Sequence, residues 1–90
     1  MYKHFAIIDV ETTGGKFNEE KITEIAIIVY DGDKVIDNFE TLINPEIDIQ
    51  PFVQKLTGIN NELVKNSPKF KDVSERVFDI TKDKIIVAHN

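Results

Sequence analysis

Two carboxylates separated by one residue, Asp9 and Glu11, end a short apolar run near the N-terminus. Side chains two apart on a β-strand point to the same face, so these two carboxylates would lie side by side. Like charges that close repel unless one is protonated or a cation lies between them. Oxygen ligands without cysteine or a nearby histidine suit Mg²⁺ or Mn²⁺ rather than zinc. We therefore predict that Asp9 and Glu11 bind a divalent cation.

A plainer interpretation is that Asp9 and Glu11 cap the strand and face solvent, because an Asp-x-Glu pattern alone carries little information. The residues that follow favour the chemical interpretation. Thr12, Thr13 and Gly14 come directly after the carboxylates, and they supply hydroxyls and backbone N–H groups. Groups of this kind hold the sugar and phosphate of a nucleotide, so we predict that these three residues bind substrate.

Four predicted strands position these residues. Runs rich in isoleucine and valine are typical of strands, and a Gly-containing turn at residues 31–33 indicates a hairpin. The predicted strands cover residues 5–11, 22–30, 35–43 and 85–88. We also expect Glu24, on the second of them, to hydrogen-bond to backbone, as most buried acids do.

Short helices are predicted between the third and fourth strands. The first begins at Pro51 and ends at Gly58, because proline suits the first helical position and glycine the end of a helix. The second is capped by Asn60 and runs to Val64. The third is longer, with Ser67 as its cap and Pro68 in its first turn. Residues at helical spacing predict the buried stripe of this third helix, namely Phe70, Val73, Val77 and Ile80.

The order of elements predicts an α/β fold with a three-stranded meander, a helical crossover and a fourth strand parallel to the first. The first strand then lies in the middle of the sheet. A receiver-like α/β domain with an acidic magnesium pocket is an alternative. Such doubly wound folds place a helix after the first strand, whereas a polar loop and a hairpin follow here, which counts against that alternative.

Composition narrows the class of protein. The chain has 90 residues and no cysteine, so we expect one small domain without disulfides or cysteine-based zinc sites. Its longest apolar run, residues 25–30, is far shorter than the ~20 residues of a membrane span, and the N-terminus lacks a signal-peptide layout. We therefore expect a cytoplasmic protein with no membrane partner. The net charge of −5 argues only weakly against nucleic-acid binding, since a metal-dependent nuclease needs clustered carboxylates.

Residues 5–14 resemble the first exonuclease motif of the DEDD (DnaQ-like) family, which includes the proofreading epsilon subunit of bacterial DNA polymerase III. The resemblance continues in order along the chain. Residues 22–26 resemble the family's second strand, and residues 42–45 resemble the end of its third. Residues 56–64 and 67–70 resemble the substrate-side loop and the helix after it. Residues 87–90 resemble the opening of the second exonuclease motif.

The resemblance implies a ribonuclease H-like fold and 3′→5′ hydrolysis of nucleotides from DNA or RNA ends. It implies two metal ions, Mg²⁺ or Mn²⁺, held by four carboxylates. Asp9 would be shared by both ions and Glu11 would bind one. Leu56 and Thr57 match positions that contact the terminal nucleotide. Many relatives have histidine in place of Thr57, so a helix-end role for Thr57 stays open.

The remaining family motifs are not in this sequence. The aspartate of the second motif and the whole third motif would follow Asn90, and His89 is expected to be structural. We therefore interpret residues 1–90 as the N-terminal part of a single exonuclease domain, inactive alone. Expected partners are a single-stranded or frayed 3′ end, polymerase subunits or a fused second domain, and another copy bound through the sheet edge at residues 85–88. A non-catalytic module that binds nucleic acid or a cation remains an alternative, and the choice between proofreading, repair and RNA turnover stays open.

Overall fold

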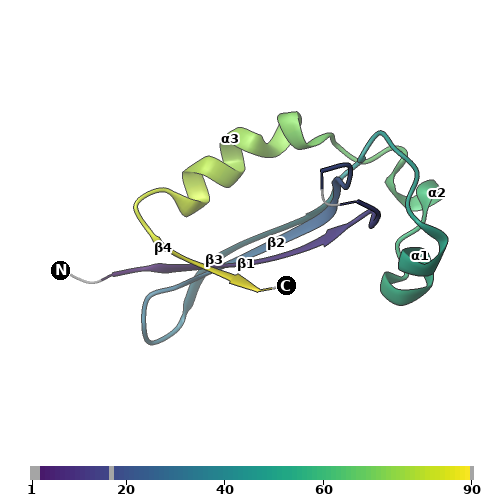
Figure 1. Cartoon of the computed structure of the whole chain (residues 1–90). Coiled ribbons are helices and arrows are strands. Elements are labelled where there is room, and N and C mark those ends of the chain that lie inside the picture. The colour runs from purple at the N-terminus through teal and green to yellow at the C-terminus, as the bar shows by residue number, and fades with distance from the viewer. Residues whose placement is uncertain (1–2, 17, 90) are drawn as a thin grey trace.

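The computed structural model describes residues 3–16 and 18–89, apart from the side chain of residue 89. Its sheet has the strand order β3-β2-β1-β4 (Figure 1). The pairs β1–β2 and β2–β3 are antiparallel, and β4 runs parallel to β1. The predicted meander, crossover and parallel fourth strand are thus confirmed, with β1 inside the sheet. The strands are β1 (Phe5–Thr12), β2 (Ile22–Tyr30), β3 (Val35–Leu42) and β4 (Ile85–His89).

The crossover from β3 to β4 contains three helices, α1 (Pro51–Thr57), α2 (Asn61–Val64) and α3 (Phe70–Thr81). Gly58 closes α1 with a φ of 77°, a conformation that glycine adopts without penalty. The Asn60 side chain accepts a hydrogen bond from the Leu63 N–H at 2.9 Å, as predicted for the cap of α2. None of the described helices has the length and apolar character needed to cross a membrane.

The start of α3 differs from the sequence prediction, which placed the cap at Ser67. The helix begins two residues after Pro68, whose carbonyl accepts a hydrogen bond from the Asn44 N–H at 2.8 Å. The Asp72 carboxylate accepts a hydrogen bond from the Lys69 N–H at 2.9 Å. The segment before α3 therefore stays extended because it bonds to the chain after β3, and Asp72 supplies the acceptor at the helix start.

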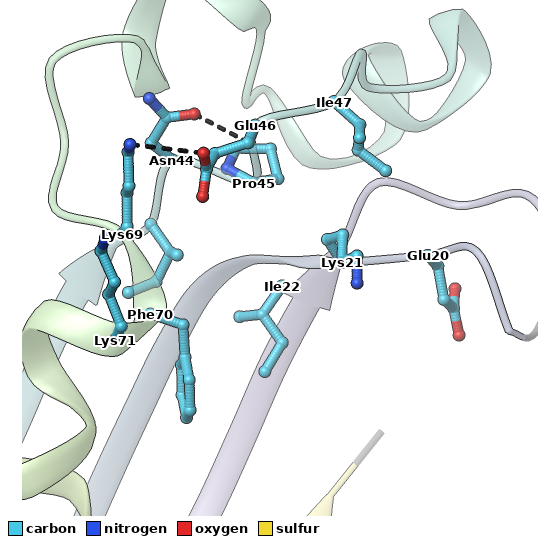
Figure 2. A pocket seen from close by; sticks show the side chains of 11 residues that line it. Glu20, Lys21, Ile22, Asn44, Pro45, Glu46, Ile47, Lys69, Phe70 and Lys71 are labelled. Carbon is cyan, nitrogen blue, oxygen red and sulfur yellow. Dashed lines mark hydrogen bonds and ion pairs between the residues drawn. The ribbon is translucent and has the colours of Figure 1, made fainter.

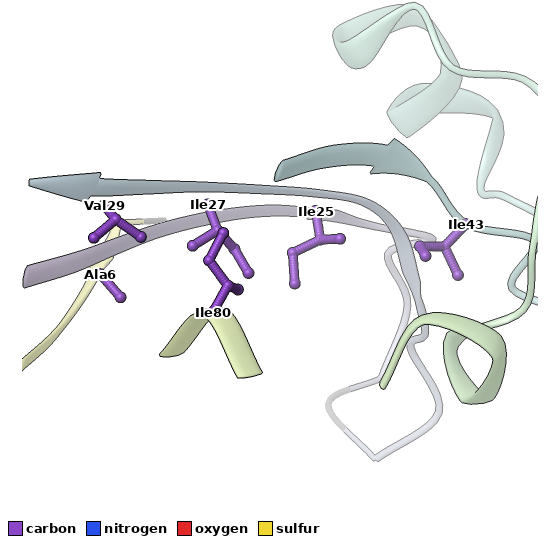
Figure 3. Close-up of a cluster of buried hydrophobic side chains, with 6 residues drawn as sticks. All are labelled: Ala6, Ile25, Ile27, Val29, Ile43 and Ile80. Carbon is purple, nitrogen blue, oxygen red and sulfur yellow. The ribbon is translucent and has the colours of Figure 1, made fainter. Parts of the chain in front are cut away.

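One face of the sheet forms the core under α3. Val73 and Val77 pack against this core from the helix, as the predicted stripe required. Phe70 does not, since it is 42% exposed; it is the first residue of α3 and lines an open cavity with Ile22 and Ile43. Figure 3 shows the buried side chains of this cluster, Ala6, Ile25, Ile27, Val29, Ile43 and Ile80.

The opposite face of the sheet is open. No helix lies over it in the part of the chain that the structure describes (Figure 1), and Ile28, Ile85 and Val87 on that side are exposed. Side chains alternate between faces along a strand. Because Ala6 and its even-numbered neighbours in β1 pack under α3, the odd-numbered residues of β1 point to this open face.

Candidate active site

Asp9 and Glu11 lie on the open face near the end of β1. Their neighbours Ile8 and Val10 pack against the core cluster on the other face, so alternation places both carboxylates together. Asp9 is exposed and Glu11 is half-buried. In the sheet, Asp9 lies between Ala26 of β2 and the backbone of residue 89 in β4. The carboxylates therefore share one face over the interior of the sheet, as predicted.

Two further carboxylates, Glu24 and Glu40, lie close to this pair. Glu24 is directly opposite Glu11, and Glu40 on β3 is opposite Ala26. The pKa of Glu24 is raised above its usual 4.5, first by burial and then by the negative charges of Glu40, Glu11 and Asp9. Within the described residues its carboxylate has no hydrogen bond to backbone, which corrects the sequence expectation. Glu40, Glu11 and Asp9 thus place negative charge around Glu24 from the two neighbouring strands.

The sequence analysis gave Glu24 a structural role and did not single out Glu40, because it could not fix the register of β1 on β2. The two strands are joined by a loop rather than a tight turn, and the register shifts between Glu11 and Thr12. A shift of this kind is typical of a β-bulge, which re-aims side chains and often lies beside a functional site. Strand alternation from Ile25 would have placed Glu24 on the open face.

The loop after Glu11 is held by Thr13. Its side chain is buried, and its hydroxyl accepts a hydrogen bond from the Lys21 N–H at 3.1 Å and donates one to the Gly14 carbonyl at 3.2 Å. The Thr13 N–H also donates to the Lys21 carbonyl at 2.9 Å. Because its hydroxyl and its N–H both bond within the chain, the structure gives Thr13 the role of shaping the loop.

Thr12 and Gly14 connect the loop to its surroundings. The Thr12 hydroxyl donates to the Glu20 carboxylate at 3.0 Å. Gly14 has a φ of 74°, and a Cβ added there would lie 2.6 Å from Cγ2 of Val53 in α1. The Gln50 N–H donates to the Thr13 carbonyl at 2.9 Å. The loop beside the carboxylates is thus packed directly against the start of α1.

Leu56 and Thr57, the other predicted substrate contacts, end α1. Leu56 is 81% exposed and is free to meet a ligand. The Thr57 hydroxyl donates a hydrogen bond to the Val53 carbonyl at 2.8 Å and accepts one from the Ile59 N–H at 3.1 Å. These bonds to backbone groups give Thr57 a structural role at the end of α1. The side chain of His89 and all of Asn90 lie outside the described residues.

The carboxylates on the open face have the right chemistry to bind a hard divalent cation, but they are few. Asp9 and Glu11 offer carboxylate oxygens on one face, as Mg²⁺ and Mn²⁺ require. Among the described residues, however, no group of three or more Asp, Glu, His or Cys side chains is placed to hold a metal ion. Asp9 and Glu11 therefore supply two carboxylates of the kind that a hard divalent cation binds, which is fewer ligands than such an ion takes.

A separate cavity of about 610 Å³ lies at the start of α3 (Figure 2). Its floor includes Ile22, Ile43 and Phe70, and an ion pair between Lys69 and Glu46, with 3.3 Å between nitrogen and oxygen, stands at its rim. Neither Asp9 nor Glu11 lines it.

Comparison with known proteins gives a consistent family. The family model described as "Exonuclease" (RNase_T) matches residues 6–90. The chain is 38% identical over 86 residues to a "DNA polymerase III PolC-type" of Caldanaerobacter subterraneus subsp. tengcongensis. It is 36% identical over 86 residues to a "3'-5' exonuclease DinG" of Staphylococcus epidermidis. Both alignments cover 96% of this chain but only 6% and 10% of the two relatives.

Solved structures agree with the observed fold. Exonuclease X in complex with 5′ overhanging duplex DNA superposes with a TM-score of 0.80 and 28% identity, covering 96% of this chain and 48% of that one. The nuclease domain of 3′hExo, a DEDDh family member bound to rAMP, superposes with a TM-score of 0.79 and 25% identity, covering 99% and 52%. Both structures extend well beyond the region that this chain matches.

Proposed function

This chain belongs to the RNase_T exonuclease family as an N-terminal portion of the DnaQ-like type, and we propose that it forms part of a metal-dependent 3′→5′ exonuclease. The observation that carries the proposal is the shared face of Asp9 and Glu11, at the end of a central strand and beside a loop anchored to α1. DNA is the proposed substrate, and RNA is the alternative for the same site.

Asp9 and Glu11 would hold the divalent ions, with Asp9 as the ligand that both ions share. Bound ions of this kind activate the attacking water and neutralise charge on the leaving 3′ oxygen. The chain's own part is to fix both carboxylates on one rigid strand, so that little reorganisation is needed when substrate binds. Crowding by Glu24 and Glu40 further favours a cation here, because it raises the local negative potential.

The loop at residues 12–14 and the exposed Leu56 would hold the terminal nucleotide. Gly14 lets the backbone approach closely, since it carries no side chain. Leu56 offers an apolar contact for the base or sugar. Thr12 and Thr13 contribute by fixing the loop through their hydrogen bonds to Glu20 and Lys21.

The 90-residue chain alone should not hydrolyse nucleic acid at a useful rate. The resemblance calls for four carboxylates and a group that positions the water, and residues 1–90 supply Asp9 and Glu11 of that set. Loss of a general base typically costs ~10²–10⁴-fold. We further propose that the natural protein supplies the remaining groups and is joined to, or works with, polymerase or other domains, since the chain spans 6% and 10% of the two curated relatives.

The test is a single-stranded DNA oligonucleotide, labelled at its 5′ end and incubated with Mn²⁺. The proteins are the 90-residue chain, the full natural protein that carries it, and the full protein with Asp9→Ala or, as an exposed control on α3, Asp79→Ala. We expect stepwise 3′ shortening by the full protein and the control. Asp9→Ala should be slower by about 10³-fold, because several kcal/mol of charge stabilisation are lost.

Two results would contradict the proposal. Shortening that survives Asp9→Ala would remove Asp9 from the site. Binding of the oligonucleotide without any shortening by the full protein would favour the alternative, a non-catalytic nucleic-acid-binding module.

A further inference from the structure

The exposed side of α1 carries a large aromatic residue that the site described above does not use. Phe52 is 65% exposed and lies one turn before Leu56, which is 81% exposed. Residues four apart lie on the same side of a helix. Phe52 and Leu56 therefore form a continuous exposed apolar strip on α1.

This strip is rigidly connected to the candidate active site. Val53, between the two residues in sequence, is 8% exposed and packs against Gly14. The Gln50 N–H donates to the Thr13 carbonyl at 2.9 Å at the start of the same helix. Figure 1 shows α1 beyond the ends of β1 and β2, displaced from the sheet away from α3 and so toward the open face. A ligand on the open face at Glu11 thus has α1 as its neighbour.

A positively charged side chain, Lys55, lies beside this apolar strip. Lys55 is exposed, lies three residues after Phe52 and one before Leu56, and forms no ion pair within the described part of the chain. An aromatic ring, an aliphatic side chain and a free ammonium on one arc of a helix match what single-stranded nucleic acid offers, namely the faces of bases and the phosphates between them. The positive charge also complements phosphate in a region where the neighbouring sheet face is acidic.

We propose that Phe52 stacks on a base just upstream of the 3′-terminal nucleotide of a single DNA strand, and that Lys55 contacts the phosphate beside it. This inference rests on the proposed exonuclease function. It extends the site from one nucleotide at Leu56 to at least two. Binding of this kind is independent of sequence, because every base has an aromatic face.

The experiment measures binding of a fluorescent single-stranded DNA to the full natural protein by anisotropy. EDTA removes divalent ions, and a gel of the recovered DNA checks that it stays intact. Phe52→Ala should weaken binding about tenfold, whereas Phe52→Trp should stay within about threefold of the unmodified protein. Phe78→Ala is the matched control, since Phe78 is also a helical phenylalanine and is 61% exposed. This control should bind as the unmodified protein does.

A series of DNAs with one abasic position, moved from the first to the fourth nucleotide from the 3′ end, locates the stacked base. The loss caused by Phe52→Ala should disappear with one of these DNAs, because that DNA lacks the partner of Phe52. Lys55→Gln should reduce the slope of log affinity against log salt by about one. Thermal unfolding of each variant confirms that it folds.

The proposal fails if Phe52→Ala binds as tightly as the control, if its loss is the same with every abasic DNA, or if the unmodified protein shows no binding at about 100 µM. These outcomes are distinct from failure of the proposed function. Normal shortening that Phe52→Ala leaves unchanged would remove only the stacking role. Shortening that survives Asp9→Ala would contradict the catalytic assignment and leave the binding measurements intact.

Discussion

Glu11 of β1 lies directly opposite Glu24 of β2, with both carboxylates on the open face of the sheet. Like charges that face each other across an antiparallel pair destabilise it, and Glu40 and Asp9 add to the repulsion. The same arrangement that costs folding free energy provides the negative potential that attracts a divalent cation. We therefore expect a cation that binds at this site to relieve the repulsion and to stabilise the fold.

Glu24→Gln should stabilise the fold at neutral pH. The pKa of Glu24 is raised in the folded chain by burial and by Glu40, Glu11 and Asp9, so ionising Glu24 costs folding free energy. This cost is absent below about pH 4.5, where the group is protonated in both states, and is complete once the pH exceeds the folded pKa. Melting temperatures should therefore be higher for Glu24→Gln at about pH 8 and equal to wild type at about pH 4.

Glu75→Gln, on the exposed side of α3, is the control and should not show this pH dependence. A Glu24→Gln variant that melts lower than wild type at pH 8 would mean that the Glu24 carboxylate makes a stabilising contact in the folded protein.

Gly14→Ala should destabilise the chain more than Gly58→Ala. Both glycines have similar positive φ angles, 74° and 77°, but a Cβ at Gly14 would lie 2.6 Å from the Val53 side chain, whereas Gly58 has open space. Backbone strain alone costs about 1 kcal/mol, and the clash adds about 1–3 kcal/mol. Chemical denaturation of both variants measures the difference.

Gly14→Ala combined with Val53→Ala tests the cause. If the clash is real, the second substitution costs less in the Gly14→Ala background than alone, as a double-mutant cycle reports. Equal costs in the two backgrounds would show that Val53 moves aside freely.

The sequence predicted the strands well because three of them are continuous apolar runs in which local pattern and burial agree. It could not predict where α3 starts, since that depends on the long-range bond between Asn44 and Pro68. A serine followed by proline is a good local start signal, yet here tertiary contact keeps the chain extended through Lys69.

The candidate site was predicted in part for the same reason. Strand periodicity alone places Asp9 and Glu11 on one face, so their shared face could be predicted from the sequence of β1. The neighbours Glu24 and Glu40 depend on register across three strands, and the buried hydroxyl of Thr13 depends on its bond to Lys21. Alternation within β2 puts Glu24 on one face with Ala26, but no pattern within a single segment gives its cross-strand partners or the Thr13–Lys21 bond.

The edge strand β4 should cause self-association of the 90-residue chain. Ile85, Ile86 and Val87 are exposed on both faces, and β4 ends the sheet with unpaired backbone groups, which invite pairing with another copy. Ile86→Lys should weaken self-association by about tenfold or more, because charge on an edge strand opposes pairing. Sedimentation velocity at several concentrations measures it.

Ile36→Lys is the control, because Ile36 is similarly exposed but lies on β3, the other edge of the sheet. A chain that stays monomeric, or that is dispersed by Ile36→Lys rather than Ile86→Lys, would exclude β4 as the contact.

Asp9 and Glu11 should bind Mn²⁺ weakly in the 90-residue chain, since two carboxylates rarely form a tight site. In NMR spectra, paramagnetic broadening should be strongest at Asp9 and Glu11 and at the cross-strand partners Glu24 and Ala26. Residues of α3 should broaden least, because the helix covers the other face.

Three variants separate ligands from neighbouring charges in this titration. Asp9→Asn removes a ligand and should weaken binding by about tenfold or more, whereas Asp79→Asn on α3 should change nothing. Glu24→Gln keeps both ligands but lowers the negative potential, so its effect should be smaller than that of Asp9→Asn and should shrink as salt screens charge. Broadening centred away from residues 9–14, or unchanged in Asp9→Asn, would exclude this metal site and, with it, the main support for the exonuclease mechanism.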